Sequence, residues 1–187
     1  GQDLLIQIEQ IMHYAKNESG EQKIWREYVG LQSLAQQVVE QMQVSIEQSG
    51  VKVELKSDPE VWTMADPRAV RQIWQNLVSN AIKYSKAGDS VELAVAVRGE
   101  HVLLSVEDEG AGMDEADLAR IAEPFAQGRN AAGRAGTGLG LAVVKTFADL
   151  HGGKVRIDSA PGQGTRVEVS FPPAEPEPMS QFDRAAQ

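Results

Sequence analysis

The sequence predicts an α+β fold, a two-layer sandwich in which a mixed sheet of about five strands carries helices on one face. Stretches with helical spacing of apolar residues alternate with stretches of strand-like alternation, which is typical of a layered domain. Several strands are separated only by short turns, which favours hairpins over a doubly wound parallel sheet. The 187 residues suffice for one domain with a substantial core.

Composition and charge narrow the possible partners. The formal net charge is -9, whereas a nucleic-acid surface needs clustered lysine and arginine. There is no cysteine, and His13, His101 and His151 lie far apart, which argues against a structural zinc site. No apolar run is long enough to cross a bilayer, and no signal-peptide pattern is present. We therefore expect no nucleic-acid partner, no membrane contact by these residues and a cytoplasmic location, either as a cytoplasmic protein or as the cytosolic part of a membrane-bound one.

Residues 1–20 are predicted to contain an amphipathic helix from Asp3 to about Lys16. Its apolar residues include Leu4, Ile8, Ile11 and Ala15. In one interpretation this helix packs on the core of the same domain. In the other it is the end of a longer helix that pairs with another helix or chain. The polar connector that follows favours the second interpretation, so residues 21–30 are assigned to a linker.

Residues 31–172 are predicted to form the folded domain. Asp66 and Pro67 mark a clear helix start, because aspartate caps the first N–H groups and proline fits the first helical position. The predicted helices run from Leu31 to Gln48, Pro67 to Tyr84, Glu115 to Ala122 and Leu141 to Leu150. The predicted strands, expected to pair with their neighbours in sequence, run from Val51 to Leu55, Val61 to Met64, Ser90 to Val97, His101 to Val106, Lys154 to Asp158 and Thr165 to Phe171. Residues 173–187 are rich in proline, glutamate and alanine and are predicted to be a disordered tail.

Polar residues interrupt the core stripe of the predicted helix that ends at Tyr84. Asn76 and Asn80 are four positions apart, so they share one helix face with Lys83. An amide oxygen can bind Mg²⁺, and a lysine can neutralise phosphate. Asparagine is a poor helix former, which favours a functional role over the alternative of an exposed polar edge.

Two glycine-rich segments follow. Asp108 stands at a strand end before Gly110 and Gly112, where its carboxylate could accept from an adenine amine or belong to an ordinary turn. Gly136, Gly138 and Gly140 precede an apolar run that predicts a helix start, an arrangement that favours phosphate. The order of residues fits neither a P-loop nor a dinucleotide-binding fingerprint.

In this order and spacing, the segments resemble the ATP-binding domain of sensor histidine kinases, which shares a superfamily with gyrase-type, heat-shock chaperone and mismatch-repair ATPases. The resemblance covers about Leu31 to Pro172 and implies a Bergerat-type ATP-binding fold. Its motifs are an N box at Asn76–Tyr84, a first glycine box at Asp108–Gly112, an F box at Glu123–Phe125, a second glycine box at Gly136–Leu141 and a glycine-threonine element at Gly162–Thr165.

The resemblance implies that the domain binds ATP and Mg²⁺. Asn80 would coordinate the metal, Asp108 would accept from the adenine amine, and residues 113–135 would form a lid. The implied catalytic residues are Asn76, Lys83 and Arg134, with Arg129 as a further candidate near the γ-phosphate. The implied nucleotide-binding residues are Asn80, Lys83, Tyr84, Asp108, Gly110, Gly112, Met113, Phe125, Gly136, Thr137, Gly138, Leu139, Gly140, Leu141 and Thr165.

The resemblance also implies partners. Residues 1–20 are similar to the end of the second helix of the family's dimerisation domain. That domain would present the phosphoacceptor histidine, and a response regulator would receive the phosphate. His13 does not match the phosphoacceptor motif, so we expect no autophosphorylation by these residues alone. Ala122 also departs from the family, because it stands where the F box often has an aromatic residue.

Two alternatives remain open within the same superfamily. One is a protein-serine kinase. The other is a nucleotide-binding or pseudokinase module that acts by protein contact. A stand-alone ATPase is disfavoured, because Asn76 occupies the position at which the superfamily's ATPases carry a water-activating glutamate.

Overall fold

The computed structural model describes residues 24–56, 59–121 and 138–172. Five strands form one sheet in the order β2-β4-β5-β7-β6, and β1 pairs with β3 in a separate two-stranded sheet. The strands are β1 (Glu27–Gly30), β2 (Lys52–Lys56), β3 (Trp62–Ala65), β4 (Ser90–Arg98), β5 (His101–Asp108), β6 (Lys154–Ser159) and β7 (Thr165–Phe171). The helices are α2 (Leu31–Gln41), α3 (Gln43–Ser49), α4 (Pro67–Tyr84), α5 (Glu115–Leu118) and α6 (Gly140–Leu150).

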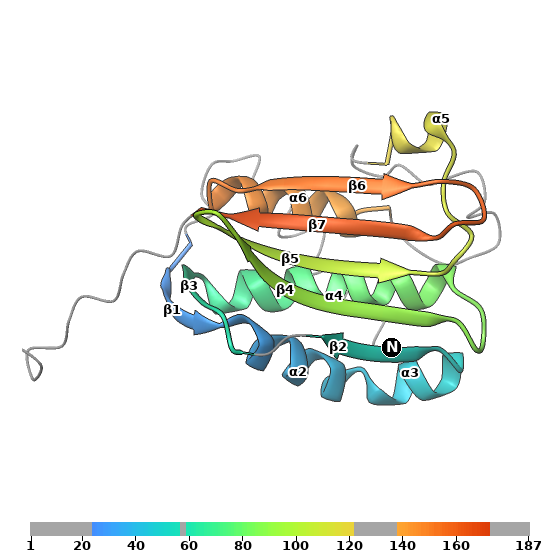
Figure 1. Cartoon of the computed structure of the whole chain (residues 1–187), viewed down its shortest axis with the longest axis horizontal. Coiled ribbons are helices and arrows are strands. Elements are labelled where there is room, and N and C mark those ends of the chain that lie inside the picture. Colours follow the sequence, from blue (N-terminus) through green and yellow to red (C-terminus); the bar gives the residue numbers. More distant parts are fainter. Residues whose placement is uncertain (1–23, 57–58, 122–137, 173–187) are drawn as a thin grey trace, which may run out of the picture.

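The five-stranded sheet is mixed, as predicted. β2 runs parallel to β4, and the other neighbouring strands are antiparallel. The long helices cover one face of this sheet, and Figure 1 shows α4 lying behind β4 and β5 and α6 lying behind β7 and β6. Together these features confirm the predicted α+β sandwich.

The core lies between α4, α6 and the helix-facing side of the sheet. Along β4, Val91 and Leu93 are fully buried, and along β5 so is Leu104. These side chains alternate with outward-facing residues, as the pleat of a strand requires. From the helix layer, Ile73 and Trp74 of α4 fill the space against them.

The start of α4 forms as predicted. Asp66 is the N-cap, and its Oδ1 accepts hydrogen bonds from the amides of Arg68 and Ala69 at 2.9 and 3.4 Å. Its Oδ2 accepts from the Trp25 amide at 2.9 Å. Although burial acts to raise the pKa of Asp66, these backbone hydrogen bonds hold it below its usual value. One buried carboxylate thus joins the chain before β1 to the first turn of α4.

The predicted helix from Leu31 to Gln48 is interrupted in the structure. Met42, with φ -94° and ψ 2°, separates α2 from α3. Apolar residues continue at helical spacing across this point, from Val38 to the buried Ile46, so the pattern alone does not predict the break. α3 ends at Ser49, one residue beyond the predicted helix end at Gln48, and Gly50 follows with a φ of 69°.

The strands before α4 pair differently from expectation. Residues 27–30, placed in the linker by the sequence, form β1, which pairs with β3. The rings of Tyr28 and Trp62 stack across this pair with centroids 5.4 Å apart. β2 pairs with β4 instead of β3, so the expected pairing of β2 and β3 was wrong. Hydrophobic alternation identifies a strand but does not identify its neighbour.

Other predictions have different outcomes. α5 is helical only over Glu115–Leu118, shorter than the predicted helix to Ala122. The predicted helix within residues 1–20, residues 122–135 of the implied lid and the tail 173–187 lie outside the described residues. Over the described ranges, no helix is both long and apolar enough to cross a membrane.

Candidate nucleotide-binding site

The asparagine face of α4 lies against the first residue of α6. Asn76 is 4 % exposed, and its Nδ2 donates to the carbonyl of Gln72 at 2.9 Å. A Cβ at Gly140 would lie 3.2 Å from Asn76 Oδ1 and 3.5 Å from Asn80 Nδ2. Glycine therefore lets the start of α6 approach both asparagines closely. This contact joins two of the sequence segments predicted to act together.

The N-terminus of α6 can favour an anion at this junction. Within the described part of the chain, no side chain caps it, and the preceding Gly138 has a φ of 72°. The fully buried Leu139 anchors the junction in the core, together with Leu141. The first N–H groups and the positive end of the helix dipole attract negative charge. The half-buried Asn80 lies beside this helix end, as a phosphate-bound metal would require.

Lys83 and Tyr84 lie at the C-terminal end of α4, and both are half-buried. The Lys83 ammonium lies 4.8 Å from the centroid of the Tyr84 ring. A cation over an aromatic face is attracted by the ring quadrupole, which restrains the flexible lysine stem. The lysine is therefore held on the same part of α4 as Asn80.

Asp108 ends β5 on the helix-facing side of the sheet and is 9 % exposed. Its Oδ1 accepts from the amides of Gly110 at 2.9 Å and Thr165 at 3.2 Å. Burial raises the pKa of this carboxyl, while the two backbone hydrogen bonds act in the opposite direction. Across the described residues no hydrogen bond is made to Oδ2, so this oxygen can accept from a ligand.

The loop after β5 packs tightly on neighbouring backbone. A Cβ at Gly110 would lie 2.6 Å from the carbonyl oxygen of Tyr84. Gly164 has a φ of 74°, and a Cβ there would collide with the carbonyl of Asp108. The Gly162 amide donates to the carbonyl of Ala111 at 2.8 Å. The end of α4, the loop after β5 and the turn before β7 therefore hold Asp108 between them.

The structure brings together most of the predicted site residues that it describes. Gly140 adjoins Asn76 and Asn80, Gly110 adjoins Tyr84, and Thr165 binds Asp108. Met113 leaves this loop half-buried, with its amide held by Ser159 at 2.9 Å. The predicted site residues outside the described ranges are Phe125, Arg129, Arg134, Gly136 and Thr137.

A metal at this site would need ligands other than clustered acids. In the described ranges, no group of three or more histidine, cysteine, aspartate or glutamate side chains could hold a metal ion. Mg²⁺ is commonly bound by one or two protein oxygens together with substrate phosphates and water. The Asn80 amide beside α6 fits that kind of site.

Two residues with structural roles were not identified from the sequence, one beside Thr165 and one at the opposite end of α4 and α6 from the candidate site. The Ser159 hydroxyl accepts a hydrogen bond from the Met113 amide. His151, which the sequence places in a turn, is only 1 % exposed. The Nε2 of His151 accepts from the Asp66 amide at 3.0 Å, and its Nδ1 lies 2.6 Å from the carbonyl of Phe147. Ser159 pairs with Thr165 between β6 and β7, so the pairing register of these strands, if known, would have placed both side chains on the helix-facing side. No local sequence signal identifies His151.

Comparison with known proteins agrees with this geometry. Residues 65–175 match the family described as histidine kinase-, DNA gyrase B-, and HSP90-like ATPase, and the chain belongs to that family. Within it, relatives and solved structures place the chain with the catalytic ATP-binding domains of sensor histidine kinases.

The chain is 36% identical over 178 residues to the non-motile and phage-resistance protein of Caulobacter vibrioides. It is 35% identical over 174 residues to the histidine protein kinase DivJ of the same organism. Each match covers 92% of this chain but only 21% and 29% of the respective relative. The chain therefore corresponds to less than a third of these proteins.

Among solved structures, full-length ShkA in complex with AMPPNP superimposes with a TM-score of 0.81 and 30% identity, over 93% of this chain and 36% of ShkA. The Acinetobacter baumannii histidine kinase AdeS gives a TM-score of 0.78 at 22% identity, over 93% of this chain and 80% of that one. The second likeness supports the fold alone.

Proposed function

We propose that the chain binds Mg-ATP and, in the intact protein, donates the γ-phosphate to a histidine on a preceding helical domain. The observation that carries this proposal is the role of α4 as a common support. Its asparagines meet the start of α6, and its C-terminal end packs on the loop that holds Asp108. One helix thus links the side of the site suited to phosphate with the side suited to a base.

The described residues would divide the work between base and phosphates. Asp108 would accept from the adenine amine, with Thr165, Gly110, Gly112 and Met113 shaping the loop around it. The second group comprises Asn76, Asn80, Lys83, Tyr84, Gly138, Leu139, Gly140 and Leu141, which would surround the phosphates. Mg²⁺ held through Asn80 would neutralise phosphate charge.

Phosphoryl transfer asks the protein mainly for positioning and electrostatic stabilisation. Lys83 would supply positive charge from α4. Arg134 would add charge at the γ-phosphate, and Phe125, Gly136 and Thr137 would complete the nucleotide site. The roles of Arg134, Phe125, Gly136 and Thr137 rest on the sequence alone, because these residues lie outside the described ranges.

The wider setting belongs to the same proposal. Residues 1–20 would end a dimerisation helix, and the acceptor histidine would precede them. A response regulator would then receive the phosphate in the cytoplasm. The sensor histidine kinases among the relatives support this assignment over a protein-serine kinase.

A thermal-shift titration tests the proposal. Mg-ATP and Mg-ADP should raise the melting temperature in proportion to the logarithm of ligand concentration over Kd. The stabilisation is about 2.7 kcal/mol at a hundredfold excess over Kd. Omitting Mg²⁺ should weaken the effect of ATP. An unchanged melting temperature at millimolar Mg-ATP would favour a module that acts by protein contact alone.

A further inference from the structure

Three polar residues form a row across neighbouring strands at one end of the sheet. In the strand register, Asp108 of β5 pairs with Thr165 of β7, and Thr165 pairs with Ser159 of β6. Paired residues in a sheet point to the same face. Ser159 therefore lies on the helix-facing side with Asp108, two strands away from it.

The Ser159 hydroxyl makes three contacts that together fix its hydrogen. Its Oγ donates to the carbonyl of Gly164 at 2.8 Å and accepts from the Met113 amide at 2.9 Å. The Thr165 Oγ1 lies 2.9 Å away. A serine hydroxyl has one hydrogen, and a carbonyl oxygen can only accept. Since Ser159 gives its hydrogen to Gly164, Thr165 must donate to Ser159.

This assignment determines what Thr165 can offer to a ligand. Once its hydrogen is directed to Ser159, the Thr165 hydroxyl can only accept from other groups. Its own amide donates to Oδ1 of Asp108 at 3.2 Å, which keeps the two residues adjacent. The described site thus presents two acceptors together, the Asp108 carboxylate and the Thr165 hydroxyl.

We propose that Ser159 is a positioning residue that sets base selectivity. It holds the Thr165 hydroxyl as an acceptor beside Asp108, so the site favours a purine with a 6-amino group over one with a 6-oxo group. This inference rests on the proposed nucleotide binding. A 6-amino group, or a water bound to it, donates to these acceptors, whereas a 6-oxo group places a third acceptor against them.

The test compares Mg-ATP with Mg-ITP, whose base carries a 6-oxo group, by titration calorimetry on the whole chain. Wild type should bind ATP more tightly than ITP. Ser159→Ala frees the Thr165 hydroxyl to donate, so the ratio of ATP to ITP affinity should fall roughly tenfold. Ser159→Thr keeps a hydroxyl at this position and should restore the ratio.

Ser170 provides a matched control. Its hydroxyl also accepts from a backbone amide and donates to a carbonyl, both of Lys154, but it lies at the other end of β7 on the opposite face. Ser170→Ala should leave the ratio at its wild-type value.

The outcomes separate this inference from the proposed function. If wild type binds neither nucleotide, the proposed function fails. If wild type prefers ATP and Ser159→Ala keeps the same ratio, even with both affinities reduced, the selectivity role of Ser159 is overturned. If Ser159→Ala shows no cooperative melting, Thr165→Val decides, because loss of the hydroxyl should also lower the ratio and an unchanged ratio overturns the inference.

Discussion

At the scale of single residues, burial and hydrogen bonding give Asp108 its character. The carboxylate is buried, and backbone amides from the loop after β5 and from the start of β7 fix one of its oxygens. Burial alone favours the neutral acid, while the amides favour the anion. A ligand amine would add a further donor and favour the anion again. The sequence identified this aspartate, but its bond to Thr165 depends on the pairing of β5 with β7.

Asp108→Ala should weaken nucleotide binding strongly. A hydrogen bond to a charged group contributes roughly 1.5–3 kcal/mol, so the affinity for Mg-ATP should fall about ten- to a hundredfold. Titration calorimetry measures this change. Glu107→Ala is the matched control, because Glu107 precedes Asp108 on the same strand but faces outward and bonds Arg166. Equal affinities in the two variants would place the base elsewhere.

At the scale of elements, a buried histidine connects the two helices of the site. His151 follows the last residue of α6, and its ring accepts the Asp66 amide at the start of α4. Arg26, just before β1, donates to the carbonyl of Leu150 at 3.2 Å. The chain that leads into the domain is thereby bonded to the ends of both α4 and α6. The hydrogen bonds of His151 with Asp66 and of Arg26 with Leu150 each join residues more than eighty positions apart in the sequence.

His151 should make stability depend on pH. Burial lowers its pKa below 6.5, and nearby Arg26 acts in the same direction, whereas the Phe147 carbonyl and Asp66 oppose the change. The unfolded chain therefore binds the proton more readily than the folded chain. The contribution of the neutral His151 to the free energy of unfolding is fully present above about pH 6.5. It is lost as the pH falls toward the pKa of His151 in the folded protein, by up to about 1.4 kcal/mol per pH unit.

Urea unfolding between pH 5 and 8 measures this dependence. His151→Asn should lower stability at pH 8 and flatten the slope below pH 6.5. His101→Asn, at an exposed histidine on β5, should retain the wild-type slope. If His151→Asn and wild type have the same slope, another group is responsible.

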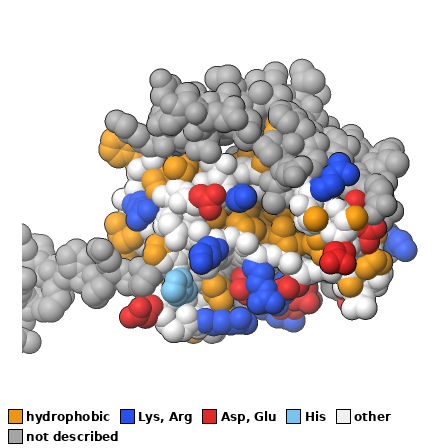
Figure 2. Space-filling model, turned by 90° about the horizontal axis from the view of Figure 1, so that it is seen from above, with side chains coloured by type: hydrophobic (Ala, Val, Ile, Leu, Met, Phe, Trp, Pro, Cys, Tyr) orange, Lys and Arg blue, Asp and Glu red, His pale blue; other side chains and the backbone are white. Residues whose placement is uncertain are grey.

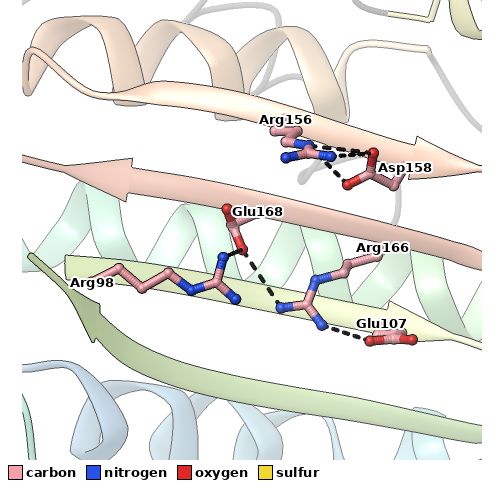
Figure 3. Close-up of polar contacts among 6 residues, drawn as sticks. All are labelled: Arg98, Glu107, Arg156, Asp158, Arg166 and Glu168. Carbon is pink, nitrogen blue, oxygen red and sulfur yellow. Dashed lines mark hydrogen bonds and ion pairs between the residues drawn. The ribbon is translucent and has the colours of Figure 1, made fainter. Parts of the chain in front are cut away.

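At the scale of the whole molecule, the two faces of the sheet do different work. The helix-facing side carries the core and the candidate site. The other side carries charged side chains in ion pairs, shown in Figure 3. Arg166 lies 2.8 Å from Glu107 and 3.5 Å from Glu168, which Arg98 approaches to 3.9 Å. On the surface in Figure 2, acidic and basic side chains are interspersed.

These outer ion pairs should contribute little to stability. The pair of Arg166 with Glu107 is solvent-exposed, and such pairs typically supply about 0–1 kcal/mol and are screened by salt. Arg166→Ala should therefore reduce the free energy of unfolding by less than about 1 kcal/mol, and less still in high salt. Leu93→Ala, at a fully buried position, should cost about 2–5 kcal/mol. Urea denaturation measures the free energy of unfolding of both variants. Similar losses would show that the outer ion pairs stabilise the fold as much as a buried core residue does.

Local chemistry made much of the fold predictable. Asp66 and Pro67 predict the start of α4. The short turn around Gly99 predicts the β4–β5 hairpin, in which Arg98 and His101 are the pair next to the turn. β1 was not predicted, because four residues show too little alternation to distinguish a strand from a linker. The break at Met42 was missed because the helical pattern continues through it.

The sequence by itself determined which side chains carry the chemistry. The capacity to bind a metal, to accept a hydrogen bond or to approach an anion belongs to the side chains themselves. It follows from an amide pair on a helix face, a carboxylate at a strand end and glycines before a helix. Only the tertiary structure decided how they combine. Register set Ser159 and Thr165 beside Asp108, and helix packing set Gly140 against Asn76. The physical reason is that hydroxyl orientation, burial and close backbone approach arise between segments, where sequence spacing carries no information about contact.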